Sequence, residues 1–160
     1  MSERRRFRDG GEWESAYGYC RAIRTDDLIL VSGCTSAVDG AVRHPADPAA
    51  QTRVAIDTAL AAVTALGGAV GDVVRTRIYL THRRDCDAVG QVHAEVFGEN
   101  PPVSTMVVVV GLLHPDMRVE IEVEAVVAAR AQDDDVVADP SQGDDVAADP
   151  SQGGDVVEDP

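Results

Sequence analysis

The chain has 160 residues, 44% of them hydrophobic, and a formal net charge of −14. This length suffices for one domain with a hydrophobic core. All fourteen basic residues are arginine, which excludes a lysine Schiff base, lysine-bound pyridoxal phosphate and the lysine of a P-loop. The chain lacks a stripe of positive charge that would follow a phosphate backbone, so we expect no nucleic-acid partner.

The N-terminal third predicts strands. The run "RRRFRD" at 4–9 is a weak first strand, and the β-type runs "YGYCRAIR" (17–24) and "DLILVSG" (27–33) follow it. The short polar link at 25–27 favours an antiparallel hairpin between the second and third strands. The Gly-, Pro- and Asp-containing stretch at 35–48 is predicted to be a loop.

A helix is predicted to begin at Asp47 and Pro48, because Asp is a good N-cap and Pro suits the first turn. Apolar residues recur at helical spacing after it, and the glycines at 67–68 end it. The run "DVVRTRIYLT" (72–81) predicts a strand with Arg75, Arg77 and Tyr79 on one face.

A second amphipathic helix is predicted at about 85–97, followed by strands at 104–110 and 118–128. The predicted order is β-β-β-α-β-α-β-β. The economical arrangement is an α+β fold with a single sheet and two helices on one face.

The last two strands differ in pattern. In "VEIEVEA", valine and isoleucine alternate with Glu120, Glu122 and Glu124, which leaves the glutamates on the face away from the helices. The run "MVVVV" (106–110) is apolar on both faces instead. A strand of that kind in so small a chain favours burial against another subunit.

We divide the chain into a domain at 1–130 and an acidic tail at 131–160. The tail holds a ten-residue near-repeat, "VVADPSQGDD" and its variants, and is predicted to be disordered. Ten acidic residues and no basic one lie in 133–160, so the rest of the chain carries a net charge of only −4.

Three cysteines without a CxxC pair fit reduced thiols in a cytoplasmic protein. The apolar runs are too short to span a bilayer, so we expect no membrane partner.

The chain resembles the RidA family, also called YjgF/YER057c/UK114. The resemblance rests on five stretches in family order: "GYCRAIRTDDLILVSG" (18–33), "QTRVAIDTALAAVTALGG" (51–68), "DVVRTRIYLT" (72–81), "VHAEVFGENPPVSTM" (92–106) and "RVEIEVEAV" (118–126). It implies a chorismate-mutase-like fold and a homotrimer whose sheets form a central β-barrel. It also implies that small-molecule substrates bind at the subunit interfaces.

The best-known activity of the family is the hydrolysis of reactive enamines and imines to a carbonyl compound and ammonia, without a metal or organic cofactor. Carried over residue by residue, the resemblance implies that Glu120 positions or activates water and that Tyr19 completes the catalytic site. Ser32 and Gly33 match a Ser-Gly pair whose backbone lines the substrate pocket. A carboxylate in a desolvated cleft can transfer protons near neutral pH, which agrees with the role of Glu120.

This chain departs from the family pattern at the arginine that holds the substrate carboxylate as a bidentate fork. That position falls on Ser104, or on Val103 if the alignment shifts by one residue. We prefer Ser104, because Met106 then takes the place often held by cysteine, and we count both among the substrate-binding residues. Arg77 or Arg118 would replace the missing arginine if its side chain faced the cleft.

Other residue types offer weaker candidates. Cys34 lies two residues after the Ser-Gly pair, but no histidine is close in sequence, so a buried small residue is the simpler interpretation. The four histidines have no HxH or HxxxH spacing, so no metal site is predicted.

The sequence leaves three functions open. The first is RidA-like hydrolysis of a reactive imine or enamine, and the missing arginine leaves open a substrate without the usual amino-acid carboxylate. The second is a divergent biosynthetic enzyme specific to one pathway, whose pocket admits a neutral or larger intermediate. The third is a non-catalytic trimer that binds a small ligand.

Overall fold

The computed structural model describes residues 4–127 of the chain. Its main sheet has six strands in the order β1-β2-β3-β8-β6-β7. These strands are β1 (Arg4–Phe7), β2 (Ala22–Thr25), β3 (Leu28–Cys34), β6 (Val73–Leu80), β7 (Val103–Val108) and β8 (Val119–Val126). The strand β7 pairs parallel to β6, whereas the other neighbours pair antiparallel.

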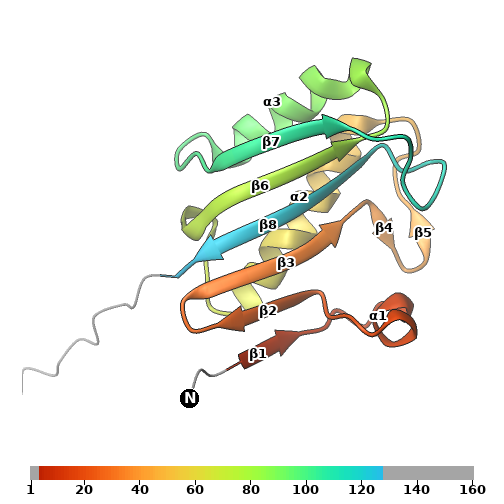
Figure 1. Ribbon diagram of the computed structural model, residues 1–160. Helices are drawn as coiled ribbons and strands as arrows, with labels where there is room; N and C mark the ends of the chain where they lie inside the picture. The colour runs from red at the N-terminus through yellow and green to blue at the C-terminus, as the bar shows by residue number, and fades with distance from the viewer. Residues whose placement is uncertain (1–3, 128–160) are drawn as a thin grey trace, which may run out of the picture. The chain divides into compact units, whose positions relative to one another are not determined.

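Helices α2 (Pro48–Ala65) and α3 (Cys86–Phe97) lie on the same face of this sheet (Figure 1). The predicted α+β architecture is thereby confirmed. Asp47 caps α2 as expected, since its side chain accepts a hydrogen bond of 3.0 Å from the backbone N–H of Ala50. The helix ends before Gly67, which takes a positive φ of 88° that favours glycine.

Two parts of the chain differ from the prediction. A short helix, α1 (Glu12–Tyr17), occupies the start of the predicted second strand, and β2 begins only at Ala22. Within the predicted loop lies a small hairpin of β4 (Ala37–Val38) and β5 (Ala41–Val42). The strand prediction was wrong at Tyr17 because Gly18, with a φ of 72°, ends a helix there instead of continuing a strand.

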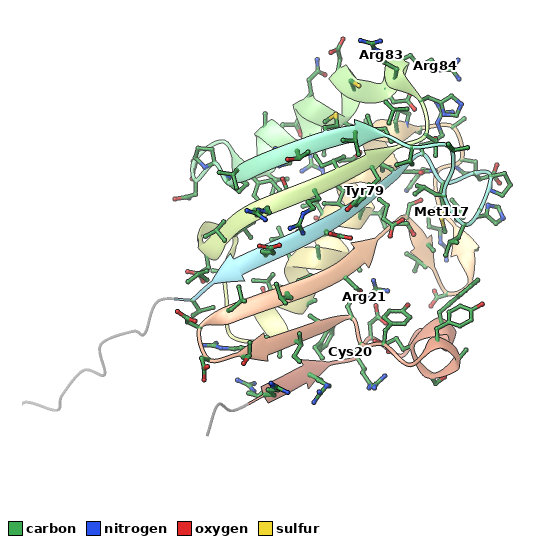
Figure 2. All side chains as sticks on the ribbon, viewed as in Figure 1. Cys20, Arg21, Tyr79, Arg83, Arg84 and Met117 are labelled. Carbon is green, nitrogen blue, oxygen red and sulfur yellow. The ribbon has the colours of Figure 1, made fainter. Side chains whose placement is uncertain are left out.

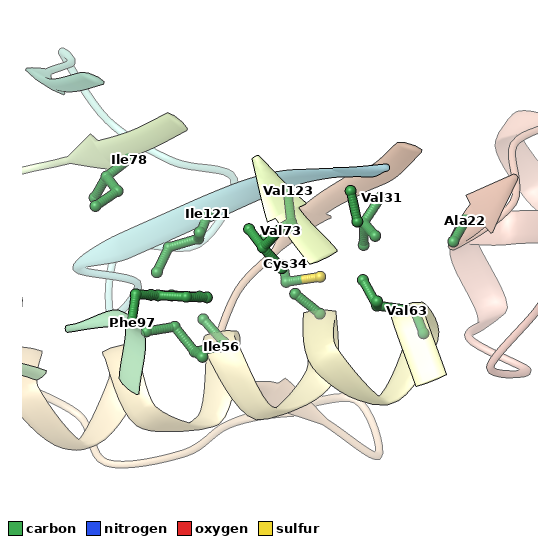
Figure 3. Packing of buried hydrophobic residues seen from close by; sticks show 14 of the residues in the cluster. Ala22, Val31, Cys34, Ile56, Val63, Val73, Ile78, Phe97, Ile121 and Val123 are labelled. Carbon is green, nitrogen blue, oxygen red and sulfur yellow. The ribbon is translucent and has the colours of Figure 1, made fainter. Parts of the chain in front are cut away.

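The core lies between the sheet and the two large helices (Figure 3). Ile121 and Val123 of β8 face Ile56 and Val63 of α2, and Phe97 of α3 closes one side. All five side chains are at most 1% exposed. The alternation read from "VEIEVEA" thus places the aliphatic residues in the core and leaves the glutamates on the opposite face, which we call the open face.

Two short 3-10 helices, at Val70–Asp72 and Arg83–Asp85, complete the elements of the described part. No helix among residues 4–127 is long and apolar enough to cross a membrane. The acidic tail predicted at 131–160 lies outside the described residues.

Candidate active site

A cavity of about 460 Å³ opens at the end of the sheet near α1 and the β4–β5 hairpin. Arg21 and Met117, which both line it, are labelled at this end in Figure 2. The lining also includes four residues that the family resemblance singled out, namely Tyr19, Ser32, Gly33 and Glu120. The fold therefore brings together residues from 19 to 120 around one space; their roles stay predictions.

Gly33 and Glu120 touch each other on neighbouring strands. The pairing of β3 with β8 shifts register between Val31 and Cys34, so Gly33 lies in a bulge. A Cβ atom on Gly33 would lie 2.8 Å from the Glu120 Cδ and closer still to Oε1. Only glycine therefore lets the Glu120 carboxylate rest directly on the backbone of β3.

The Glu120 carboxylate forms no salt bridge within the described part of the chain. Among the described residues it makes no side-chain hydrogen bond either, and the ion pairs of β8 belong to Glu122 and Glu124. Desolvation by burial raises the pKa of Glu120, and the nearby charge of Glu122 adds to this, while Arg21 opposes it. A carboxyl group of this kind is suited to take up and return a proton.

Among the described residues, Arg21 is the one arginine that lines the cavity. Its Nε donates to Asp9 Oδ2 at 2.7 Å, and its Nη1 donates to the Gly33 carbonyl at 2.7 Å and to Ser32 Oγ at 3.2 Å. The side chain is only 14% exposed. Arg21 therefore ties the loop before α1 to the bulge that supports Glu120.

The short helix α1 forms a wall of the cavity through two aromatic residues. The rings of Trp13 and Tyr17 lie 5.2 Å apart, and both residues line the cavity. Glu14, only 3% exposed, holds this helix in place by accepting hydrogen bonds from the backbone N–H groups of Gly10 and Arg21, the latter at 2.7 Å. A buried carboxylate satisfied in this way fixes the orientation of α1.

The loop before β8 supplies the opposite wall, with Leu113, His114 and Met117. The fully buried Gln51 of α2 anchors this loop. Its Nε2 donates to the Asp116 carbonyl at 2.8 Å, and its Oε1 accepts from the Arg118 backbone N–H at 2.8 Å. One buried amide thus holds the chain just before the strand that carries Glu120.

Ser104 and Met106 lie elsewhere in the described chain. Ser104 is in register with Thr76 on β6, whose hydroxyl donates to Ser104 Oγ at 2.9 Å. Thr76 faces the helices and also contacts His93 of α3 at 2.9 Å. Met106 packs against the core from the same side. Neither residue is among those that line this cavity.

The two arginines considered as replacements for the missing clamp are engaged away from the cavity. Arg77 pairs on the open face with Glu124 at 2.8 Å and Glu122 at 3.2 Å. Arg118 forms a largely buried ion pair with Asp85 at 2.6 Å. The sequence analysis did not identify Arg21 as the arginine that lines the cavity.

Cys34 packs with the core and also borders the cavity, but it offers no thiolate. It is 1% exposed, and Figure 3 shows its sulfur between β3 and α2. Burial raises the pKa of the thiol to about 11, although Arg21 opposes this shift. Among the described residues, no group of three or more His, Cys, Asp or Glu side chains could hold a metal ion.

The aromatic wall was also missed, although the sequence carries a signal for it. Trp13 and Tyr17 are spaced i, i+4, which places them on one face of a helix, and Gly18 follows as a C-terminal stop. Arg21 and Asp9 leave no such pattern, because the ion pair joins two segments of irregular chain.

The chain matches the model of the family described as Endoribonuclease L-PSP over residues 11–127. A protein of Streptomyces coelicolor called uncharacterized is 40% identical over 121 residues, which cover 76% of this chain and 90% of that protein. The 3-aminoacrylate deaminase RutC of Acinetobacter baylyi is 36% identical over 104 residues, which cover 64% of this chain and 82% of RutC.

A crystal structure of a Mycobacterium tuberculosis member of the YjgF/YER057c/UK114 family is similar with a TM-score of 0.71 and 43% identity. The match covers 78% of this chain and all of that one. Together with the family model, which spans both Gly33 and Glu120, this match shows that the chain belongs to the YjgF/RidA family.

Proposed function

We propose that this chain hydrolyses reactive imines or enamines to a carbonyl compound and ammonia. The observation that carries the proposal is the Glu120 carboxylate, which lies on Gly33 in the cavity and forms no salt bridge with any described residue. Membership of the YjgF/RidA family and the similarity to a protein named 3-aminoacrylate deaminase support it.

The proposed reaction begins with a protonated imine in the cavity and a water molecule beside Glu120. The carboxylate takes a proton from water while the oxygen forms a bond to the imine carbon, which gives a neutral carbinolamine and a protonated Glu120. Glu120 returns this proton to the nitrogen. It then removes the hydroxyl proton as the carbonyl forms and the C–N bond breaks. The departing ammonia takes that proton and leaves as ammonium.

An enamine enters the same sequence once it is protonated on carbon to give the imine. We propose that Tyr19 hydrogen-bonds the substrate through its hydroxyl group, because it lines the cavity beside Arg21. Ser32 and Gly33 line the pocket, and Arg21 fixes the position of this segment by donating a hydrogen bond to the Gly33 carbonyl. In this mechanism Arg21 is a positioning residue.

We also propose the trimer that the family resemblance implies. The open face exposes apolar side chains on the edge strand β7, with Val103 63% and Val107 44% exposed. A substrate-binding role for Ser104 and Met106 would require a cavity completed by a second copy. Val107→Asp is expected to lower the mass measured by light scattering from that of a trimer, and a monomeric wild-type chain would contradict this assembly.

The description of the matching family names an endoribonuclease, and we expect no such activity here. The chain has no lysine, and its charge of −14 disfavours a phosphate backbone. The arginine that lines the cavity is already bound to Asp9.

The test is ammonia release from 2-aminoacrylate and from carboxylate-free imines generated in situ. Glu120→Gln keeps the shape of the side chain but removes the base, so we expect the accelerated rate to fall by about 10²–10⁴-fold. Glu124→Gln is the matched control, because Glu124 lies on the same face of β8 but pairs with Arg77. Equal rates for both variants would contradict the role of Glu120.

A further inference from the structure

The charges around the cavity are unfavourable for an anionic ligand. Two carboxylates, Asp9 and Glu120, and one guanidinium, Arg21, belong to the lining, and His114 adds an imidazole. With an uncharged imidazole and both carboxylates ionised, these groups carry a net charge of −1. A substrate carboxylate would therefore meet repulsion from Glu120 in a partly desolvated space.

Arg21 is poorly placed to offset that repulsion. A bidentate clamp needs two parallel N–H donors free to face the ligand. Here Nε already donates to Asp9, and Nη1 is shared between Ser32 and the Gly33 carbonyl. Arg21 Nη2 can offer a carboxylate a single donor, but a fork through Nε and Nη2 would require the carboxylate to displace the Asp9 contact of 2.7 Å.

Glu120 and the aromatic wall favour a cation instead. The carboxylate has no ion-pair partner among the described residues, although the glutamates at 122 and 124 on the same strand each have one. Trp13 and Tyr17 are 44% and 69% exposed, and a cation or an aromatic ring can bind to their rings. The cavity of about 460 Å³ is in the range of sites for drug-sized ligands, well above what a three-carbon substrate fills.

We infer that the cavity selects an iminium cation that lacks a carboxylate and carries an aromatic or bulky apolar group. The positive C=N group lies against Glu120, and the apolar group lies against Trp13 and Tyr17. This inference rests on the proposed function, whose substrate class it narrows. It separates this chain from a protein named for 3-aminoacrylate, which is a carboxylate.

The first test measures binding with stable mimics that share a benzyl group. Phenylacetamidine carries a planar cation in place of the iminium, and phenylacetate carries a carboxylate. Trp13 is the single tryptophan of the chain, so its fluorescence reports directly on the wall of the cavity. We expect phenylacetamidine to bind at least about tenfold more tightly than phenylacetate. Equal affinity, tighter phenylacetate, or no binding of either compound would overturn the inference.

Two substitutions locate the source of this preference, with calorimetry as the readout and the melting temperature as a check on folding. Glu120→Gln is expected to abolish the preference, whereas Glu124→Gln keeps it. Asp9→Asn removes one negative charge and weakens the contact that holds Arg21 Nε, so phenylacetate should bind about tenfold more tightly than it does to wild type. If phenylacetate binding does not change in a folded Asp9→Asn variant, the inference about Arg21 is wrong.

The second test is catalytic and separates this inference from the proposed function. An amine oxidase acting on phenylethylamine and an amino-acid oxidase acting on phenylalanine release imines that share the aryl group but differ in the carboxylate. We expect faster hydrolysis of the imine from phenylethylamine. Preference for the imine from phenylalanine would overturn the inference and leave the proposed function standing. Tight amidine binding without hydrolysis of either imine would refute the proposed function and support the ligand class.

Discussion

Glu120 and Glu122 lie two residues apart on β8 and point from the same face of the sheet, but their surroundings differ. Glu122 is in register with Arg77 on β6, which pairs with it at 3.2 Å. Glu120 is in register with Tyr79 and lies on Gly33 of β3 on its other side. One strand thus carries both a neutralised carboxylate and an unpaired one.

The comparison teaches that the neighbouring strands decide the chemistry of a repeated residue. The "VEIEVE" pattern makes all three glutamates equivalent. The difference has two sources. The residue opposite on β6 is charged for Glu122 but not for Glu120, and the bulge in β3 places Gly33 where the Glu120 carboxylate can lie against it. Substitutions at Gly33, Tyr19, Cys34 and Glu122 each test one feature of the surroundings of Glu120.

The largest effect is expected from Gly33→Ala, which fills the space under Glu120. The new methyl group would overlap the carboxylate, so Glu120 must move and imine hydrolysis should fall by about 10²-fold or more. Overpacking at this site should also lower the free energy of unfolding by about 1–3 kcal/mol. Urea titration and the ammonia assay measure the two effects.

Gly90→Ala is the matched control for that variant. Gly90 lies in α3, and a Cβ atom there meets nothing within 4 Å. Alanine should therefore raise the free energy of unfolding by about 0.5–1 kcal/mol and leave hydrolysis unchanged. If the two glycine variants lost activity to the same extent, the close contact between Gly33 and Glu120 would not matter for catalysis.

Tyr19→Phe should have the next largest effect, because it removes one hydroxyl group from the cavity. We expect kcat/KM to fall by about tenfold, the size expected for the loss of one hydrogen bond to a polar substrate. Tyr79→Phe is the comparison, since Tyr79 lies opposite Glu120 in register but does not line the cavity. A larger loss for the Tyr79 variant would contradict this role of Tyr19 and indicate that the hydroxyl group of Tyr79 contacts the substrate.

Cys34→Ala tests whether the buried thiol takes part in the chemistry. With its pKa raised to about 11 by burial, the thiol stays protonated at neutral pH. We expect activity within about threefold of wild type, and a loss of about 1 kcal/mol in the free energy of unfolding from the small cavity left behind. Complete loss of hydrolysis in a folded variant would instead indicate covalent catalysis.

Glu122→Gln should have the smallest effect, a shift in the pH profile. Its charge contributes to the raised pKa of Glu120, after desolvation. Hydrolysis needs ionised Glu120, so the rate should rise as the pH increases through that pKa. Without the charge of Glu122 the pKa of Glu120 falls, and the acid limb of kcat/KM should move to lower pH. A shift to higher pH would contradict the electrostatic account.

The regular elements could be predicted because their patterns are strong. Alternation identified β6 and β8, and the cap at Asp47 with the glycines at 67–68 bounded α2 closely. The helix α1 could not be found by the same means. Among its described side chains the buried one is Glu14, whose partners are backbone N–H groups, so the segment has no apolar periodicity.

The candidate site was predictable only where single residues carried a family pattern. Tyr19, Ser32, Gly33 and Glu120 line one cavity. The engagement of Arg21 by Asp9 depends on how two irregular segments meet, which no local pattern encodes. Ser104 also carried a family pattern, but it does not line this cavity. Its place on the helix-facing side follows from the parallel register of β7 with β6.

The most direct test of this account is a carbon-13 NMR titration of the Glu120 carboxyl group, with and without phenylacetamidine. The account predicts that the pKa of Glu120 in the free chain lies above the ordinary glutamate value, because the group is desolvated and unpaired. Binding of the cation should lower that pKa. An ordinary pKa in the free chain, or a raised pKa that the cation leaves unchanged, would contradict an unpaired carboxylate that binds the cationic substrate.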